Sequence, residues 1–264
     1  MAYLGGKAKS SEHILSVLNS DFFNGYDYIE PFCGYCHIVR RVENKKSYTI
    51  SDNNELLIVL LKHIQDTKGE HPIITKDEYT QLRINPKLNK LKAAYAAFCY
   101  SYNGKYFGGF VNKYDGRNYP EERKSYYNIL HDNVSFHSAK IRRTDYTAYM
   151  DVTNKLIYCD PPYADTTEYH ASFNSPAFWE DMRHLSKKNY VFISEYTSPK
   201  DFMCIVKKTK RMSLSGVGAT RKNSERLFVH ESRLEDPIIK QIIKENKYSC
   251  IKRERQTRKV HKKN

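Results

Sequence analysis

The chain has 264 residues, and 44 Lys and Arg against 30 Asp and Glu give it a formal net charge of +14. This length suits one large domain or one domain with an insert, and a hydrophobic content of 40% allows a sizeable core. A chain this basic is typical of proteins that bind a polyanion, although charge that serves only solubility gives the same balance.

We expect an intracellular protein that is neither membrane-spanning nor secreted. The longest apolar stretch, residues 56–61, is far too short to span a bilayer. Residues 1–10 lack the apolar core and the cleavage pattern of a secretory signal. We therefore expect the protein in the cytoplasm, or in the nucleoid or nucleus of its host, with its 6 cysteines reduced.

The first predicted elements form a strand, a glycine turn and a helix. A serine-capped helix is expected to end at about Asn19, and a strand ends at Ile29. Pro31 and Gly34 then make a tight turn before a helix that begins over residues 38–42. Doubly wound sheets hold nucleotide-like ligands with this arrangement.

The same turn contains Cys33 and Cys36, followed by His37, and this spacing has other interpretations. It matches a c-type haem attachment pattern, and it also resembles a thioredoxin-type redox pair. Haem attachment requires export, which the sequence does not predict, and zinc would need a second Cys/His pair at short spacing. The redox pair stays open as an alternative.

A second predicted strand, residues 47–52, ends at Asp52. In doubly wound folds an acid about 20 residues past the glycine turn accepts hydrogen bonds from ribose hydroxyls. Asp52 also suits the N-cap of a helix predicted over residues 55–65, and both roles are compatible.

Residues 55–135 break the alternation of strands and helices. The sequence predicts helices here over residues 56–64, 91–100 and 119–130, and one that follows a capping box made by Thr75 and Glu78.

Between these helices, residues 101–117 interleave Tyr and Phe with Lys, Arg, Asn and Gly, and Asp115-Gly116 signals a hairpin turn. Aromatic and basic hairpins can enter a DNA groove and stack on displaced bases, although an ordinary surface hairpin has the same pattern. Lys113 and Arg117 are candidates for DNA contact.

The alternation resumes after this segment. We expect a short strand over residues 134–137 and a helical piece that begins at Asp145 and Tyr146.

Residues 155–163 then combine a buried strand with a rigid turn. Residues 155–159 have the composition of a buried strand. Pro161 and Pro162 have no backbone N–H to donate to a sheet, and each holds φ at about −65°. Pro162 also keeps Pro161 out of the helical region. The stiff backbone therefore gathers the Asp160 carboxylate, two carbonyls and the Tyr163 ring around one spot, unless Tyr163 simply covers the core.

The remaining residues complete the predicted sheet. The sequence predicts a helix capped by Ser175 with Pro176 in its first turn, strands over residues 190–194, 203–210 and 226–230, and a loop over residues 216–224. The basic tail from residue 247 suits either phosphate attraction or a solvated end.

Asp-Pro-Pro-Tyr after a strand resembles the signature of amino-group methyltransferases that use S-adenosylmethionine. Over nearly its whole length the chain resembles the Dam-like (D12 class) DNA N6-adenine methyltransferases, which share its order of glycine turn, inserted segment and Asp-Pro-Pro-Tyr. In the family turn, Phe-x-Gly-x-Gly, Cys36 replaces the second glycine, and because cysteine is small we expect the loop to survive.

The resemblance implies a role for each matched motif. It assigns catalysis to Asp160, Pro161, Pro162 and Tyr163. It assigns cofactor binding to Tyr3, Lys7, Glu30, Pro31, Phe32, Gly34, Asp52, Asp145, Tyr146 and Asp160. It assigns DNA binding to Tyr102, Asn103, Lys105 and Asn112, beside Lys113 and Arg117.

The resemblance also implies an α/β fold, a Rossmann-like S-adenosylmethionine-dependent methyltransferase sheet. Residues 1–54 and 136–264 would form this catalytic domain, and residues 55–135 an inserted, mainly helical DNA-recognition domain that carries a β-hairpin. Double-stranded DNA is the expected partner, with no metal and no membrane. A monomer or weak homodimer is expected, and a cognate restriction endonuclease is allowed.

The expected reaction is direct transfer of a methyl group to adenine N6 in a short DNA site, which leaves S-adenosylhomocysteine. Asp160 and the Pro161 carbonyl would accept hydrogen bonds from N6, while Tyr163 stacks on a base flipped from the duplex. The alternatives are a methyltransferase of RNA or protein amino groups, a DNA-binding module without activity, and a redox protein that uses Cys33 and Cys36.

Overall fold

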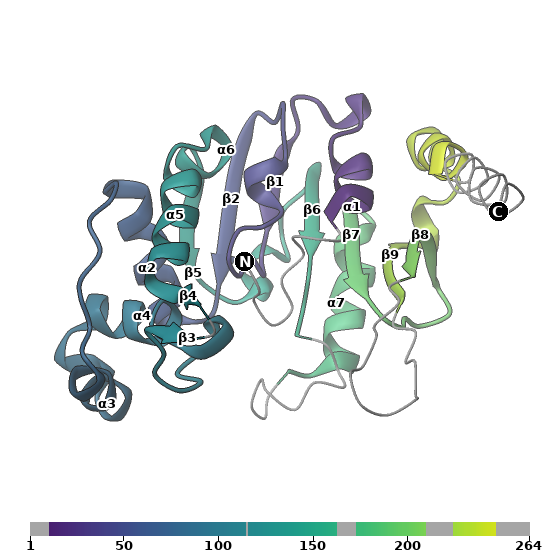
Figure 1. Cartoon of the computed structure of the whole chain (residues 1–264). Helices are drawn as coiled ribbons and strands as arrows, with labels where there is room; N and C mark the ends of the chain where they lie inside the picture. Colours follow the sequence, from purple (N-terminus) through teal and green to yellow (C-terminus); the bar gives the residue numbers. More distant parts are fainter. Residues whose placement is uncertain (1–10, 115, 163–172, 210–223, 247–264) are drawn as a thin grey trace, which may run out of the picture.

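A mostly parallel sheet of seven strands organises the chain. The computed structural model describes residues 11–114, 116–162, 173–209 and 224–246. Its main sheet has the order β5-β2-β1-β6-β7-β9-β8 (Figure 1). The strands are β1 (Asp27–Glu30), β2 (Ser47–Asp52), β5 (Lys140–Arg143), β6 (Lys155–Cys159), β7 (Tyr190–Glu195), β8 (Phe202–Thr209) and β9 (Ser224–His230). Neighbours from β5 to β7 pair in parallel, and β9 runs antiparallel to both β7 and β8.

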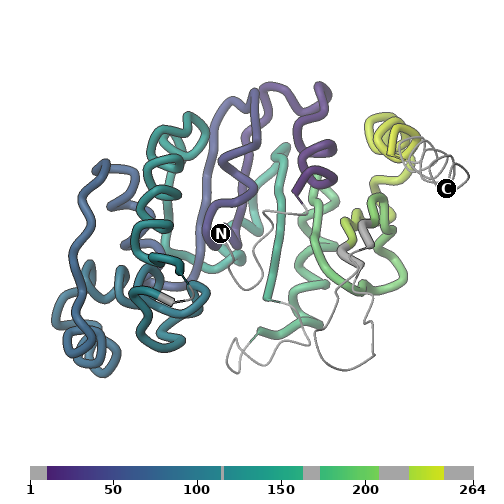
Figure 2. Tube along the Cα trace, in the orientation of Figure 1, coloured from purple at the N-terminus to yellow at the C-terminus, as the bar shows by residue number. Residues whose placement is uncertain are grey.

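Helices cover both faces of this Rossmann-like sheet, as predicted. The α-helices are α1 (Ser11–Leu18), α2 (Glu55–Asp66), α3 (Lys76–Ile84), α4 (Lys90–Phe98), α5 (Tyr119–His131), α6 (Val134–His137) and α7 (Ser175–Ser186), and residues 237–246 are also helical. Helix α2 packs on β2 and β5, α4 and α5 pack on α2, and α3 packs on α4. Figures 1 and 2 show α2, α3, α4 and α5 at the β5 end of the sheet, with β8 and β9 at the opposite end.

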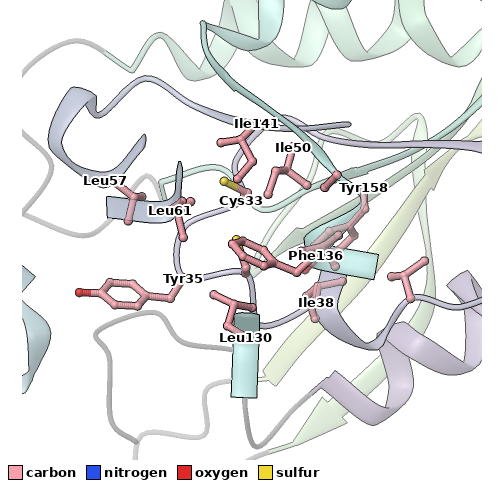
Figure 3. Packing of buried hydrophobic residues seen from close by; sticks show 14 of the residues in the cluster. Cys33, Tyr35, Ile38, Ile50, Leu57, Leu61, Leu130, Phe136, Ile141 and Tyr158 are labelled. Atoms are coloured by element: carbon pink, nitrogen blue, oxygen red, sulfur yellow. The ribbon is translucent and has the colours of Figure 1, made fainter. Parts of the chain in front are cut away.

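Alternating side chains of the central strands fill two cores, one on each face. Tyr28, Ile50 and Tyr158 belong to the core that also holds Leu57 of α2 and Leu130 of α5 (Figure 3). Their sequence neighbours point to the other face, where Ile29 and Ile157 pack with Phe178 and Met182 of α7. Burial on both faces explains why these strands read as nearly continuous apolar runs.

The hairpin predicted around Gly116 is confirmed. Strands β3 (Lys113–Tyr114) and β4 (Arg117–Asn118) pair antiparallel and form a separate two-stranded sheet just before α5.

Two elements differ from the sequence predictions. The strand predicted over residues 134–137 is wrong, since these residues form α6, where Asn133 accepts a hydrogen bond from the Phe136 amide at 3.0 Å. The helix predicted after the glycine turn is only a 3₁₀ turn, Val39–Arg41, because Val42 is already extended and the chain must reach β2 at Ser47.

Two helix caps are displaced from the residues that the sequence predicted. Asn54 caps α2 by accepting from the Leu57 amide, and Asn174 caps α7 by accepting from the Ala177 amide. Asp52 and Ser175 do not serve as these caps. The capping box of Thr75 and Glu78 at the start of α3 is confirmed.

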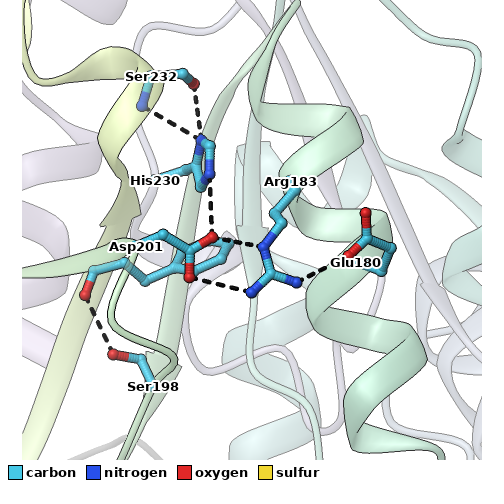
Figure 4. A network of polar contacts seen from close by, with 7 residues as sticks. Glu180, Arg183, Ser198, Asp201, His230 and Ser232 are labelled. Atoms are coloured by element: carbon cyan, nitrogen blue, oxygen red, sulfur yellow. Dashed lines mark hydrogen bonds and ion pairs between the residues drawn. The ribbon is translucent and has the colours of Figure 1, made fainter.

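A polar network ties β8 and β9 to α7 (Figure 4). The Arg183 guanidinium donates from Nε and Nη2 to the two Asp201 oxygens, and it also donates to Glu180. His230 lies with Nε2 3.4 Å from Asp201 Oδ2, and its Nδ1 accepts from the Ser232 amide at 3.3 Å. The Arg183 group beside Asp201 lowers the pKa of that carboxyl below its ordinary value. These bonds hold the antiparallel end of the sheet in place.

Some predicted segments lie outside the described residues. These are the motif residues before Ser11, Asp115, Tyr163, most of the loop over residues 216–224, and the basic tail from residue 247.

Candidate active site

Three acidic residues follow three neighbouring parallel strands and meet at one edge of the sheet. Glu30 ends β1, Asp52 ends β2 and Asp160 follows β6. Strand β1 lies between β2 and β6, with Glu30 opposite Ile50 and Ile29 opposite Ile157. The chain leaves β1 toward β2 on one side and reaches β6 on the other, and ligands of open α/β sheets bind outside the strand ends at such a point.

The loop after β1 is held against the end of β2. The Cys33 amide donates to the Ser51 carbonyl at 2.9 Å, and the Gly34 amide donates to Asp52 Oδ2 at 3.3 Å. Gly34 has φ +46° and Cys36 has φ +56°. Cys36 therefore keeps the left-handed backbone that a glycine would adopt without strain, and its side chain is fully buried.

Asp52 anchors both this loop and the start of α2. Its Oδ1 accepts from the Asn54 amide at 2.9 Å, while Oδ2 takes the Gly34 amide. Burial raises the pKa of the Asp52 carboxyl, and the backbone donors of Asn54, Gly34 and Asn53 oppose that shift. Carboxylate oxygens have further lone pairs, so a ribose-binding role stays compatible with this geometry.

Glu30 is a buried acid behind the loop. Its side chain is buried, and it accepts a hydrogen bond from the Tyr28 hydroxyl at 2.7 Å. Burial raises the pKa of Glu30 to about 8, the Tyr28 bond opposes this, and the charge of Asp160 adds to it. At neutral pH this acid therefore carries a proton.

The Asp-Pro-Pro segment leaves the carboxyl end of β6 as predicted. Asp160 is half-buried, Pro161 is buried and Pro162 is half-buried. Tyr163, the last member of the motif, lies outside the described residues, as do Tyr3 and Lys7.

Aromatic rings line the same edge. The Phe32 ring lies 5.5 Å from the Tyr146 ring at 31°, and 5.9 Å from the Phe178 ring. The Tyr146 hydroxyl donates to Asp181 at 2.9 Å. Asp145 is exposed and caps the 3₁₀ turn Tyr146–Tyr149 by accepting from the Thr147 amide. Its role in cofactor binding stays a prediction.

Two of the predicted DNA-binding residues lie beside Tyr119 at the start of α5. The Arg117 guanidinium lies 4.9 Å from the Tyr119 ring and pairs with Glu122, and the exposed Tyr102 ring lies 6.2 Å from Tyr119. Asn112 and Lys113 are exposed, whereas Asn103 and Lys105 are half-buried. The structure therefore brings Tyr102 and Arg117 together across one ring.

Comparison with protein families gives one match over most of the chain. Residues 3–203 match the family of D12 class N6 adenine-specific DNA methyltransferases. The chain belongs to this family. It is accordingly an enzyme of the adenine-specific DNA methyltransferase class, as the motifs predicted.

Among curated proteins no match is found. Solved structures give distant similarities to methyltransferases. The rRNA methyltransferase aviRa from Streptomyces viridochromogenes has 11% identity and a TM-score of 0.36, covering 84% of this chain and 82% of that one. Precorrin-6y C5,15-methyltransferase from Geobacter metallireducens GS-15 has 6% identity and a TM-score of 0.37, covering 83% and 88%.

The redox alternative for this methyltransferase fails on the chemistry of the thiols. Cys33 and Cys36 are buried, and burial raises the pKa of both. A redox pair needs an accessible thiol of lowered pKa, which is the opposite environment.

Sequence reasoning missed several residues that support the candidate site. Phe178 and Asp181 of α7 hold Tyr146, and Tyr28 holds Glu30. An aromatic residue in the first turn of the helix after Asp-Pro-Pro-Tyr was the available signal for Phe178. Asp181 has no such signal, since its partner lies 35 residues away in the chain.

Among the described residues, three or more His, Cys, Asp or Glu side chains are nowhere grouped so as to hold a metal ion. Over the same part of the chain, each helix is too short or too polar to cross a bilayer.

Proposed function

We propose that the chain transfers a methyl group from S-adenosylmethionine to adenine N6 in a short duplex DNA sequence, on a base turned out of the helix. One observation carries this proposal. The Asp160-Pro161-Pro162 turn leaves β6 directly beside the loop of Glu30, Phe32 and Gly34 that leaves β1.

The residues at this edge suit S-adenosylmethionine. The Phe32 and Tyr146 rings offer apolar faces for an adenine, and Asp52 offers carboxylate oxygens for ribose hydroxyls. The loop at Gly34 lets backbone approach a ligand closely. Bound there, the cofactor supplies an electrophilic methyl group and leaves as S-adenosylhomocysteine, with no metal required.

The chemistry on this chain's side is positioning. The amino nitrogen of adenine is a poor nucleophile because its lone pair is spread into the ring. Hydrogen bonds from its two hydrogens to the Asp160 carboxylate and the Pro161 carbonyl localise that lone pair and aim it at the methyl group. The nitrogen that gains the methyl group then loses one of its two protons to water. Acceptors fixed by a rigid turn need no reorganisation during the reaction.

The substrate assignment rests on charge and on the hairpin. The net charge of +14 suits a polyanion, and exposed Tyr102, Asn112 and Lys113 lie on or beside the hairpin of β3 and β4. A base must leave the stack to reach a turn at a sheet edge, and stacking by Tyr163 would hold it there. In this proposal residues 55–135 recognise the target, the protein acts as a monomer or weak homodimer inside the cell, and a restriction endonuclease can share its site.

Transfer of labelled methyl groups from S-adenosylmethionine tests the proposal directly. Unmethylated duplex DNA and an RNA transcript of the same sequence are compared, and the products are digested to nucleosides. Label in N6-methyladenine of DNA supports the proposal. Label confined to RNA, or no transfer despite cofactor binding, contradicts the DNA assignment.

Asp160→Ala is expected to lower methyl transfer by at least about 100-fold, because one preorganised acceptor is lost. S-adenosylhomocysteine affinity, measured by calorimetry, should change far less. Asp151→Ala is the matched control, since Asp151 is an exposed acid of the same stretch outside the strand ends. Unimpaired turnover by Asp160→Ala would remove Asp160 from the reaction.

A further inference from the structure

The loop after β1 that carries Gly34, called here the cofactor loop, packs the Tyr35 side chain against the helices of the 55–135 segment. Tyr35 lies between the two left-handed residues Gly34 and Cys36, and only 2% of it is exposed. Its ring packs edge-on against Phe98 of α4, with centroids 5.6 Å apart. Figure 3 shows the Tyr35 ring pointing away from the sheet residue Ile50.

Helix α5 grips the backbone of the same loop. The Tyr126 hydroxyl donates to the Tyr35 carbonyl at 2.6 Å and lies 3.2 Å from His37 Nδ1. These contacts join residues that are about ninety positions apart, so they are tertiary contacts between the loop and the inserted segment.

Arg123, one turn earlier on α5, lies between this loop and the turn that begins the predicted recognition hairpin. Its side chain is 2% exposed, and its guanidinium lies 5.8 Å from the Tyr35 ring. On its other side is Gly104, where an added Cβ would stand 2.6 Å from Arg123 Nη2. Gly104 ends the turn Tyr102–Gly104 with φ +67°, so its backbone conformation favours glycine, and a larger residue there would displace the Arg123 guanidinium.

The hairpin is tied to the same helix next to Arg123. Arg117 of β4 pairs with Glu122, and the Arg117 guanidinium lies over the Tyr119 ring. One buried, planar cation therefore lies in contact with both the turn and the cofactor loop, while its helix carries the hairpin.

We propose that Arg123 is a positioning residue through which target binding and cofactor binding strengthen one another. The inference rests on the proposed function, because it takes the 102–118 segment as the DNA contact and the loop at Gly34 as the cofactor contact. When DNA orders the turn Tyr102–Gly104, the Arg123 guanidinium beside it is held in one position. The guanidinium in turn holds the Tyr35 ring, and with it the cofactor loop. By thermodynamic linkage, a bound cofactor must then raise the affinity for DNA by the same factor as bound DNA raises the affinity for the cofactor.

The experiment measures the affinity of S-adenosylhomocysteine by calorimetry, with and without a duplex that the wild-type enzyme methylates. The ratio of the two dissociation constants is the coupling. We expect duplex DNA to tighten binding by about 5-fold or more in the wild type. In Arg123→Met the ratio should fall to about 1, and in Arg123→Lys, which keeps the charge without the planar fork, it should be intermediate.

Arg183→Met is the matched control. Arg183 also lies over an aromatic ring, 5.9 Å from Phe202, and also resides on a helix, but at the opposite end of the sheet. The Arg183→Met protein should be less stable than the wild type but should keep the wild-type ratio of the two dissociation constants. Gly104→Ala, whose methyl group would meet the guanidinium, is a second route to the same loss of coupling if Arg123→Met does not fold.

A folded Arg123→Met or Gly104→Ala protein with the wild-type ratio would overturn the inference. So would a wild-type enzyme that methylates DNA with a ratio of 1, although the proposed function would then stand. A wild-type protein that binds neither S-adenosylhomocysteine nor DNA would instead overturn the proposed function.

Discussion

Cys36 sits in a backbone conformation that costs a side chain about 1–2 kcal/mol relative to the right-handed region. It is retained because its small side chain is buried in the core beneath the loop. Sequence alone could predict that the loop survives the cysteine, because the size of the residue was known. It could not show that residue 36 adopts a left-handed φ.

We therefore predict an unusual order of stability at residue 36. Cys36→Gly loses a buried thiol but gains relief of strain, so it should be more stable than Cys36→Ala by about 1 kcal/mol. Cys36→Val, which is β-branched, should be the least stable. Urea unfolding measures the three variants, and an alanine variant as stable as the glycine variant would show that no strain is stored there.

Glu30 makes the free energy of unfolding depend on pH. Its pKa is about 8 in the folded chain against an ordinary 4.5, so the folded state holds a proton that the unfolded state releases. Its contribution is complete below pH 4.5 and is lost as pH rises through 8, with a slope of up to about 1.4 kcal/mol per pH unit.

Glu30→Gln should flatten this slope between pH 4.5 and 8, as measured by urea unfolding at a series of pH values. Tyr28→Phe is an informative companion, because loss of the hydroxyl should raise the pKa of folded Glu30 further and extend the upper end of the pH range over which stability falls. An unchanged slope in Glu30→Gln would mean that the carboxyl is charged in the folded protein.

At the scale of elements, the buried strands and the capping box of α3 were predictable, whereas the caps of α2 and α7 were not. Lys155–Cys159 was predicted to the residue because a parallel strand buried on both faces reads as an apolar run. Residues 134–137 alternate apolar and polar side chains as a half-buried strand does, yet the Asn133 cap and the Ser135 bond to the Val42 carbonyl make them helical. The local sequence pattern could not distinguish a strand from a helix here, since Val42, the partner of Ser135, is 93 residues away in the chain.

Asn54 rather than Asp52 should carry the cap of α2. Asn54→Ala removes the acceptor for the Leu57 amide and should cost about 1 kcal/mol of stability in urea unfolding. Asp52→Asn keeps an oxygen for the Asn54 amide but turns an NH2 group toward the Gly34 amide, so it should loosen the loop after β1 and lower cofactor affinity more than Asn54→Ala does. An Asn54→Ala variant as stable as the wild type would show that Asn54 does not carry the cap.

At the scale of the molecule, one core joins the sheet to the inserted segment. Ile50 and Tyr158 of the sheet share a cluster with Leu57, Tyr95 and Leu130 of α2, α4 and α5. The division into residues 1–54 with 136–264 and residues 55–135 stays a prediction about recognition and catalysis. In packing the two parts share their interior.

The whole chain should therefore unfold in one cooperative transition. The single tryptophan, Trp179 on α7, reports on the face of the sheet away from this shared core, whereas far-UV circular dichroism is dominated by the helices. Both signals should give the same urea midpoint. An earlier loss of helical signal would show that the inserted segment unfolds independently.

The site itself was more predictable than its support. Glu30, Asp52 and Asp160 could be placed at one edge because each follows a predicted strand. Arg123 could not be found, because it lies in a helix that reads as polar and its partners Tyr35 and Gly104 are brought to it only by folding.

The burial of Cys33 and Cys36 within the loop after β1 also makes their reactivity a measure of how often that loop opens. Exposed Cys204 meets a thiol reagent at once, whereas Cys33 and Cys36 meet it only while the loop is lifted from the end of β2. The alkylation rate of Cys33 and Cys36 therefore reports how often the loop opens, and a bound ligand that keeps the loop closed lowers this rate.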